Sequence, residues 1–450
     1  MSQSVAPSPE LGPGEPSTGR ARLEPPQGFV QGPSWRDQTE VQALLSEEMN
    51  PFWVEQAAVV EIFVDMPQTR ASSERALTDL PAFMAGALKK RSAVEVHERR
   101  LTPEELTQFQ GAKAIEVNNF IASKAFQALP DHLRPSRDQV VRMRWILTWK
   151  YKDDGSKKAK ARAVLLGYQD PLYEHRSTTS PTATRQSRQL QLQVAASKKW
   201  RTRKGDVTGA FLQSRPYPGD LYCVPCPEIC QAMGLPAESI MKVQKACYGL
   251  VDAPLEWYRS VCGFFDSIGL RRCWSDPCCW VLQKGDTVHG LISGHVDDFL
   301  FSGSDDDPIW TQAIAAIQKE FKWGTWEEDT YVQCGVRVRQ LPDFSFELSQ
   351  TAYVQDLKYI NLRAHRKKDR SAPTDDWEKS QLRTLLGGVS WHSQQVAPHF
   401  SADVGLLLSE INYSTIDTVF RANRLMDQVK SMGDHKLLIH SLPPSELHLG

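Results

Sequence analysis

The chain has 450 residues, of which 41% are hydrophobic and 24% charged, and its formal net charge is −1. This composition excludes a collagen, a small disulfide scaffold and a wholly disordered chain, and the length suggests about two or three domains. No apolar run approaches the roughly 18 residues that span a bilayer, and the first residues carry no secretion signal. We therefore expect an intracellular protein, cytoplasmic or nuclear, that is not secreted and contacts no membrane.

The N-terminal third is predicted to contain no catalytic group. Residues 1–35 are rich in Pro, Gly, Ser and Glu, which predicts a disordered leader. Residues 36–130 are predicted to be a helical preface, for which a docking or scaffold role is the simplest interpretation. Its clearest helix starts after Thr102, with Pro103 and Glu105 in the first turn, and is expected to run to about Leu129.

From about residue 141 short β-like runs alternate with helices. Two hairpins are predicted, one from residues 144–152 and 161–166 around a turn at 153–156, and one from 331–339 and 344–348. Residues 185–199 look helical, as do residues 377–432, which precede a strand-like run at 436–440. This interleaving predicts an α+β fold rather than a doubly wound sheet.

Nine cysteines, an odd number without a secretion signal, indicate reduced thiols. Six of them form two clusters, at 223–230 and 273–279, that together could supply four thiolates to a structural zinc ion. Only the first cluster contains a Cys-x-x-Cys pair. The spacing therefore favours small buried hydrophobes over a zinc site.

Charge is distributed unevenly along the chain. Residues 142–204 contain 16 Lys or Arg and four Asp or Glu, a local charge of +12, and the rest of the chain carries −13. Aromatic residues such as Trp145, Trp149 and Tyr151 are interleaved with these cations. A solvated surface is the usual interpretation of a charge run, but a band of this size with aromatics favours a nucleic-acid partner whose bases can stack.

Three carboxylates are the strongest candidates for chemistry. Asp206 ends a probable strand, and Asp297-Asp298 interrupts two apolar strand-like runs. Such a pair is costly between buried strands unless a cation neutralises it, and a hairpin tip near Asp206 would offer three hard oxygen ligands to Mg²⁺. Two such ions about 4 Å apart can activate a 3′-hydroxyl and stabilise a leaving pyrophosphate. The alternative is a polar β-turn, which fits the nearby Asp305–Asp307 well.

The order and surroundings of these segments resemble the reverse transcriptases of copia-type retrotransposons. The likeness spans roughly residues 105–430. Its motifs are Asp-Val-Thr-Gly-Ala-Phe-Leu at 206–212, Val-Asp-Asp at 296–298, the hairpin residues around 145–164, Thr-Ser-Pro at 179–181, and Tyr-Gly-Leu-Val-Asp-Ala-Pro-Leu-Glu-Trp-Tyr at 248–258. A further match is Leu-Ser-Gln-Thr-Ala-Tyr-Val at 348–354.

The resemblance implies a right-hand polymerase with fingers, palm and thumb-like parts, a mixed palm sheet and helical flanking segments. The reverse transcriptase would occupy residues 131–372, followed by a connection-like helical tail at 373–450. The family's RNase H domain is expected to be absent, and the chain would be a fragment of a polyprotein. Its partners would be an RNA template, a DNA primer or RNA–DNA hybrid, and deoxynucleoside triphosphates (dNTPs); its oligomeric state cannot be deduced.

The resemblance also implies a role for individual residues. Asp206 and Asp297 would bind two Mg²⁺ ions, with Mn²⁺ as a substitute, and Asp298 would complete the metal site as the supporting third carboxylate. By the resemblance, Lys160 and Arg162 would contact the triphosphate of the incoming dNTP. Its phosphate oxygens would accept hydrogen bonds from the backbone amides of Val207, Thr208, Gly209 and Ala210. Phe211 would contact the sugar and exclude a 2′-hydroxyl. Tyr248 and Gly249 would contact the templating pair, and His295 the primer end.

The sequence departs from the family pattern at three places. His295 replaces an aromatic Tyr, Asp252 stands where Gln or Asn is usual, and residues 215–219 are more Pro-rich than expected. A negative charge at Asp252 would be unfavourable beside template or nucleotide. The leading hypothesis is an RNA-directed DNA polymerase, and the alternative is a catalytically degenerate, nucleic-acid-binding relic. A metal-dependent nuclease would need a further base that the sequence does not single out.

Overall fold

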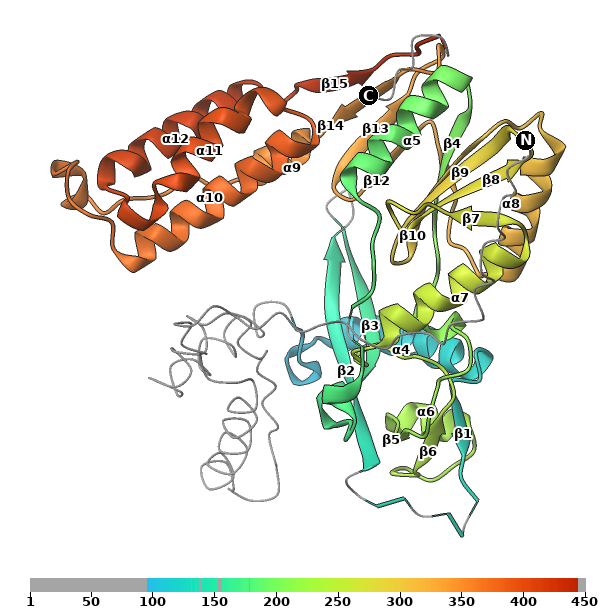
Figure 1. Cartoon of the computed structure of the whole chain (residues 1–450). Helices are drawn as coiled ribbons and strands as arrows, with labels where there is room; N and C mark the ends of the chain where they lie inside the picture. The colour runs from blue at the N-terminus through green and yellow to red at the C-terminus, as the bar shows by residue number, and fades with distance from the viewer. Residues whose placement is uncertain are drawn as a thin grey trace, which may run out of the picture. The chain divides into compact units, whose positions relative to one another are not determined.

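The computed structural model describes residues 95–130, 132–133, 135–136, 139–151, 156–177 and 179–443. The predicted leader at 1–35, the preface as far as residue 94 and the turn at 153–155 lie outside the described residues. Helices and three β-sheets alternate along the described part (Figure 1), which confirms the predicted α+β class. No helix in this part of the chain is long and apolar enough to cross a membrane.

Helix α4 (Pro103–Ala122) starts where the sequence predicts. The Thr102 hydroxyl accepts a hydrogen bond from the Glu105 amide (3.3 Å), and the Glu105 carboxylate accepts one from the Thr102 amide (3.2 Å). The predicted end at about Leu129 is wrong. Residues Phe126–Ala128 form strand β1, which pairs with β6 (Met241–Val243), a partner too distant in sequence for a local pattern to reveal.

The first sheet has five strands in the order β1-β6-β5-β2-β3. Its long hairpin joins β2 (Val140–Tyr151) to β3 (Lys157–Leu165), as predicted. Strand β5 (Tyr222–Val224) runs parallel to β2, and the other pairs are antiparallel. The sheet therefore carries the mixed strand directions that the sequence analysis assigned to the palm.

Helices α4 and α6 (Pro227–Ala232) share a core with this first sheet. Four cysteines lie in that core: Cys223, Cys226, Cys230 and Cys247. All nine cysteines are free thiols, and burial raises the pKa of the Cys226 thiol to about 12. Six of the nine thiols are buried, whereas Cys273, Cys279 and Cys334 are partly exposed. Among the described residues no group of three or more potential ligands is placed to hold a metal ion.

The second sheet carries the predicted carboxylates. Its six strands are, in spatial order, β11 (Glu327–Glu328), β4 (Arg201–Asp206), β10 (Asp298–Gly303), β9 (Thr287–His295), β8 (Cys279–Lys284) and β7 (Leu270–Arg272). Every pair in it is antiparallel.

Alternating residues of β10 point into two different hydrophobic cores. Phe299 and Phe301 point to the face covered by α7 (Ala253–Ser267) and α8 (Pro308–Glu320), where they share a core with Trp257 and Trp310. Leu300 points to the opposite face and shares a core with residues of α5 (Arg185–Lys198). The sheet is thus clamped between helices on both faces, which fixes the position of its strand ends.

The third sheet has the order β12-β13-β14-β15, with β12 at Thr330–Gln333, β13 at Val336–Gln340, β14 at Phe346–Ser349 and β15 at Lys436–Ile439. The run at 331–339, predicted as one strand, is itself a hairpin, because Cys334 and Gly335 have positive φ and reverse the chain. Strand β15 confirms the predicted C-terminal strand by pairing with β14, so strands on both sides of residue 372 share one sheet.

Four helices accompany this third sheet: α9 (Thr351–Asp356), α10 (Asp376–Gln395), α11 (Ser401–Ser409) and α12 (Ile416–Ser431). The last three form the predicted helical tail (Figure 1). Their buried side chains share one core with the third sheet. The remaining elements are short 3₁₀ turns at Glu98–Arg100, Gly167–Gln169, Tyr173–His175, Ala210–Gln213, Arg366–Lys368, Pro398–Phe400 and Ile411–Tyr413.

Candidate active site

The β9–β10 hairpin places two carboxylates at a fixed tip. His295 is paired with Asp298, which leaves Val296 and Asp297 as the two turn residues. Val296 has φ of +62°, a conformation unfavourable for a β-branched side chain. The Trp257 indole N–H donates a hydrogen bond to the Val296 carbonyl (2.6 Å), so a buried tryptophan holds this strained turn in place.

Strand β4 brings the third carboxylate to the same point. Its last residue, Asp206, is directly opposite Asp298 in the antiparallel register. The Val207 amide donates to the Asp297 carbonyl (2.8 Å), which joins the end of β4 to the hairpin tip. The structure therefore brings together Asp206, Asp297 and Asp298 from positions 91 and 92 residues apart in the sequence.

The charges of these carboxylates interact. Burial and the neighbouring Asp297 raise the pKa of Asp206. Burial raises the pKa of Asp298 to about 7, although Lys204 opposes that shift. Neighbouring carboxylates whose negative charges repel one another are stabilised by a bound cation.

Carboxylate oxygens are the ligands that Mg²⁺ prefers. No three ligating side chains in the described part of the chain are gathered closely enough to hold a cation by themselves. Asp206 and Asp297 fit as a pair of donors, because both interact electrostatically with Lys160 and with each other, whereas Asp298 is turned toward Lys204 (Nζ to Oδ1, 3.7 Å).

Lys160, on the β2–β3 hairpin, lies within electrostatic range of these acids. Burial and the neighbouring cations Arg162 and Lys150 lower the pKa of Lys160, whereas Asp206 and Asp297 raise it. The basic side chains of β3 and the acidic ends of β4 and β10 thus lie within electrostatic range of one another. This juxtaposition of elements from two sheets suits a ligand with negative phosphates bound through cations.

Two aromatic rings lie beside Arg162. The Phe211 and Tyr248 rings are 5.0 Å apart, and the Arg162 guanidinium lies 5.6 Å from the Tyr248 ring centre. Burial and the carboxylate of Glu116 raise the pKa of Tyr248 to about 12. Both aromatic rings are half-buried rather than enclosed in a core, so each keeps a surface available for contact.

The loop after Asp206 is braced by a segment that the sequence analysis did not assign to the site. The Thr208 amide donates to the Lys322 carbonyl (2.9 Å), and the Gly324 amide donates to the Asp206 carbonyl (2.8 Å). The amides of Val207 and Thr208 are therefore engaged within the protein, which leaves Gly209 and Ala210 as the amides of the predicted phosphate cradle that could meet a ligand. No local motif marks Lys322–Gly324, since its role depends on this long-range pairing.

Glu116 and Gly249 are two further site residues. Glu116, on α4, is a partly buried carboxylate. Burial raises its pKa, and the nearby cations Arg162 and Lys160 oppose part of that rise. Gly249 has φ of +96°, and a Cβ there would meet the Leu165 carbonyl oxygen at 1.9 Å. This close approach fixes the Tyr248 loop on β3. His295, by contrast, is exposed beside the hairpin tip.

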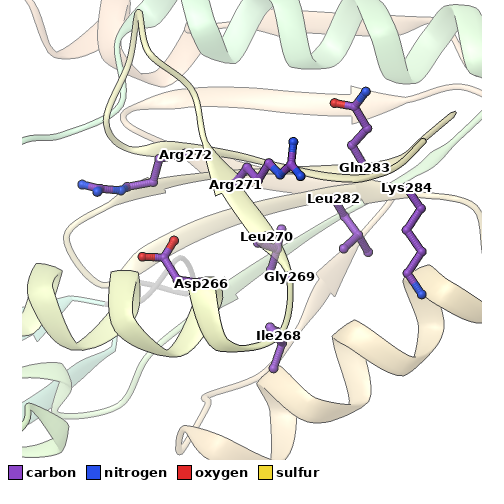
Figure 2. Close-up of a pocket in the computed structure, with 9 residues that line it drawn as sticks. All are labelled: Asp266, Ile268, Gly269, Leu270, Arg271, Arg272, Leu282, Gln283 and Lys284. Carbon is purple, nitrogen blue, oxygen red and sulfur yellow. The ribbon is translucent and has the colours of Figure 1, made fainter. Parts of the chain in front are cut away.

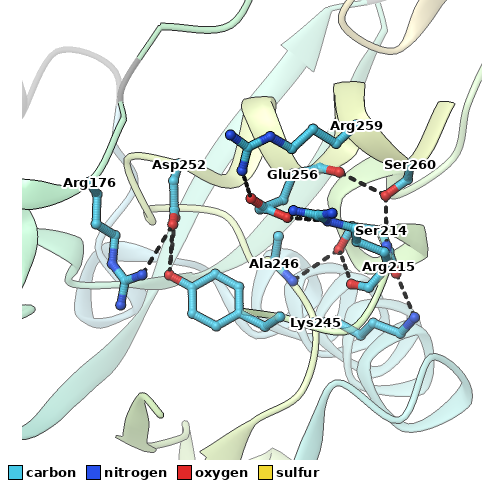
Figure 3. A network of polar contacts seen from close by, with 10 residues as sticks. Arg176, Ser214, Arg215, Lys245, Ala246, Asp252, Glu256, Arg259 and Ser260 are labelled. Atoms are coloured by element: carbon cyan, nitrogen blue, oxygen red, sulfur yellow. Dashed lines mark hydrogen bonds and ion pairs between the residues drawn. The ribbon is translucent and has the colours of Figure 1, made fainter. Parts of the chain in front are cut away.

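The departure at Asp252 has a structural explanation. Asp252 is buried, accepts a hydrogen bond from the Tyr217 hydroxyl (3.0 Å) and pairs with Arg176 (3.4 Å; Figure 3). Arg176 also pairs with Asp170. The charge of Asp252 is neutralised inside the protein, which corrects the expectation that it would face template or nucleotide. The interaction also anchors the Pro-rich 215–219 stretch.

A second part of the same network fixes this stretch to α7. The buried Glu256 carboxylate accepts hydrogen bonds from Arg215 and Arg259, each at 2.7 Å (Figure 3). The Ser260 hydroxyl accepts one from the Arg215 amide, also at 2.7 Å. The loop between β4 and β5 is thereby held against the helix that supports the hairpin tip.

Part of the basic band is neutralised by acids from outside it. Ion pairs join Arg144 to Glu95, Lys157 to Glu105, Arg203 to Asp305 and Glu328, and Lys204 to Glu327. The +12 band is therefore less exposed to a polyanion than its sequence suggests.

A surface hollow of about 580 Å³ lies elsewhere. It is lined by residues at the end of α7 and on β7 and β8 (Figure 2): Asp266, Ile268, Gly269, Leu270, Arg271, Arg272, Leu282, Gln283 and Lys284. None of the predicted site residues lines it.

Comparisons with known proteins agree on one family. The family model described as "Reverse transcriptase (RNA-dependent DNA polymerase)" matches residues 131–366. The Retrovirus-related Pol polyprotein from transposon RE1 of Arabidopsis thaliana is 31% identical over 252 residues, 56% of this chain and 17% of that protein. The corresponding polyprotein from transposon RE2 is 29% identical with the same coverage. The chain thus spans less than a fifth of the length of these relatives.

A more distant relative and a solved structure add to the comparison. The polyprotein from transposon TNT 1-94 of Nicotiana tabacum is 29% identical over 178 residues, 38% of this chain and 13% of that protein. A foamy viral protease-reverse transcriptase solved in complex with double-stranded DNA aligns with 87% of this chain and 64% of that chain, at 11% identity and a TM-score of 0.37. A likeness of this size supports no argument about the site.

Proposed function

Because the chain belongs to the reverse transcriptase (RNA-dependent DNA polymerase) family, we propose that it is an RNA-directed DNA polymerase that transfers deoxynucleotides to a primer 3′-end. The Pol polyproteins of copia-type transposons among its relatives confirm the resemblance noted in the sequence. The observation that carries the proposal is the meeting of Asp206, Asp297 and Asp298 at one end of the second sheet, opposite Lys160.

In the proposed reaction the primer 3′-oxygen attacks the α-phosphorus of a dNTP, a new P–O bond forms, the bond to the bridging oxygen breaks, and pyrophosphate leaves. The hydroxyl proton is lost to solvent. Asp206 and Asp297 would hold two Mg²⁺ ions, or Mn²⁺ in their place, with Asp298 in support. When bound, these ions would supply the charge that activates the 3′-hydroxyl and stabilises the leaving group.

The substrate contacts follow from the site. Lys160 and Arg162 bind and neutralise the triphosphate, aided by the amides of Gly209 and Ala210. Phe211 contacts the sugar in this proposal and excludes a 2′-hydroxyl by its bulk; the Tyr248 ring 5.0 Å away supports its position. Tyr248 and Gly249 contact the templating pair, and the exposed His295 contacts the primer end. An RNA template with a DNA primer is the proposed substrate.

Primer extension on an RNA template with Mg²⁺ tests the proposal. Purified protein is expected to incorporate dNTPs, and Asp206→Asn or Asp297→Asn is expected to reduce the rate at least about 100-fold, because each removes a metal ligand. Asp305→Asn is the matched control: this exposed carboxylate pairs only with Arg203 and keeps normal activity. Extension that survives Asp297→Asn combined with Asp298→Asn would refute the assignment, and salt-sensitive hybrid binding without incorporation would favour the non-catalytic alternative.

A further inference from the structure

Lys204 lies beside the carboxylates on β4, which is the middle strand between β10 and β11. It lies on β4, two residues before Asp206, and is paired with Leu300 of β10 on one side and with Glu327 of β11 on the other. Side chains two residues apart on a strand share a face, and diagonal neighbours on adjacent strands are within reach of a long side chain. The register therefore directs Lys204 toward Asp298.

Measured contacts agree with this register. The Lys204 ammonium is 3.7 Å from Asp298 Oδ1 and 3.0 Å from Glu327 Oε1. The side chains of Lys204 and Asp298 are only 15% and 20% exposed, so solvent screens the pair weakly.

Among the described residues, Lys204 is the cation that pairs with Asp298. The Oδ1 atom of Asp298 is buried and accepts no hydrogen bond from this part of the chain. A buried ionised oxygen without a hydrogen-bond donor is costly unless a charge compensates it. Lys204 supplies that charge inside the protein.

We propose that Lys204 is the built-in counter-ion of Asp298, so that a lysine holds the third carboxylate while Asp206 and Asp297 remain free to bind the catalytic cation. This inference rests on the proposed function and assigns Lys204 as a positioning residue. Glu327 fixes the ammonium from the other side and thereby couples β11 to the carboxylate site. None of the sequence motifs marks either residue.

Binding of Mn²⁺, followed by electron paramagnetic resonance without nucleotide or nucleic acid, tests the proposal on the full chain. Lys204→Met is expected to tighten Mn²⁺ binding about tenfold, because it removes a nearby unit positive charge and frees a carboxylate. The gain is expected to disappear in Lys204→Met combined with Asp298→Asn, and Lys204→Arg is expected to behave as the wild type. A merely structural lysine would lower the melting temperature without tightening metal binding.

Arg203→Met is the matched control, since Arg203 lies on the same strand and pairs with Asp305 and Glu328 rather than with the site. It is expected to leave Mn²⁺ affinity unchanged. Asp298→Asn provides a measurement that does not require Lys204→Met to fold: it should weaken Mn²⁺ binding far less than Asp206→Asn does. Equal loss in these two variants, or unchanged affinity in Lys204→Met, would overturn the inference.

Primer extension on the same preparations separates this inference from the proposed function. A wild type that shows the expected Mn²⁺ pattern but extends no primer would refute the polymerase proposal and leave the role of Lys204 standing. A protein that extends primers while Lys204→Met binds Mn²⁺ as the wild type does would refute only the role of Lys204.

Discussion

Gly249 offers the sharpest test of how the Tyr248 loop is held against the β2–β3 hairpin. Two effects make the Gly249→Ala substitution costly. Its φ of +96° disfavours any L side chain, and the new Cβ would lie 1.9 Å from the Leu165 carbonyl oxygen, which is backbone and cannot rotate away. The loop must therefore move off β3, and the hydrogen bond from the Leu165 amide to the Tyr248 carbonyl (2.7 Å) is lost.

Gly219 separates these two effects. Its φ is +97°, nearly the same as that of Gly249, but no atom lies within 4 Å of the position its Cβ would take. Gly219→Ala is therefore expected to cost only the conformational part, about 1 to 2 kcal/mol. Gly249→Ala adds a lost hydrogen bond of about 1 kcal/mol and an overpacking cost of about 1 to 3 kcal/mol. The difference between the two variants should therefore be about 2 to 4 kcal/mol.

Urea unfolding of the full chain without metal, followed by tryptophan fluorescence, measures both free energies of unfolding. Since the moved loop carries Tyr248 away from Phe211 and Arg162, Gly249→Ala is also expected to raise the KM for dNTP more than it lowers kcat. If Gly249→Ala costs no more stability than Gly219→Ala, the close approach of the loop to β3 is not a tight contact and the reasoning fails.

Asp252→Ala is expected to lower the free energy of unfolding by about 2 kcal/mol, because it deprives the buried Tyr217 hydroxyl and Arg176 of an acceptor; Asp252→Asn should cost less, and equal losses on urea unfolding would argue against a charged role. Burial lowers the pKa of His392 from 6.5 to about 4. The neutral ring therefore contributes stability that is present above pH 6.5 and is lost, by up to roughly 3 kcal/mol, as the pH falls through about 4. His392→Gln should flatten that part of the stability profile, and an unchanged slope would contradict the assignment. Adding Mg²⁺ to metal-free protein should raise the calorimetric melting temperature of the wild type but not of Asp206→Asn; an equal rise in both would show that the ion binds elsewhere.

Local patterns predicted the elements that depend on nearby residues. The capping box at Thr102, the β2–β3 hairpin, α5 and the C-terminal helices all lie where the sequence placed them, because caps, turns and periodicity act within a few residues. Errors arose where a distant partner decided the structure. Residues 126–128 left the predicted helix to pair with β6, and Cys334-Gly335 divided a predicted strand into two.

For the candidate site, the sequence predicted the carboxylates but not the residues that support them. The motifs that contain Asp206 and Asp297-Asp298 stand out in the sequence because carboxylates beside apolar strands require an explanation. The partners that hold them do not stand out. Trp257 supports the turn at Val296, and residues 322–324 brace the loop after Asp206, through hydrogen bonds that no sequence spacing encodes.

The sequence by itself identified the candidate carboxylates and the family of the chain, because both depend on residue identity and on order along the chain. Only the tertiary structure decided how each charge is compensated. The neutral total of the chain conceals a +12 band, and folding brings acids from outside that band against its cations, as Glu95, Glu105 and Glu327 show. Folding likewise buried Asp252 beside Arg176 and placed Lys204 against Asp298. Electrostatic energy depends on distance through space and on burial, and neither quantity can be read from the separation of residues along the chain.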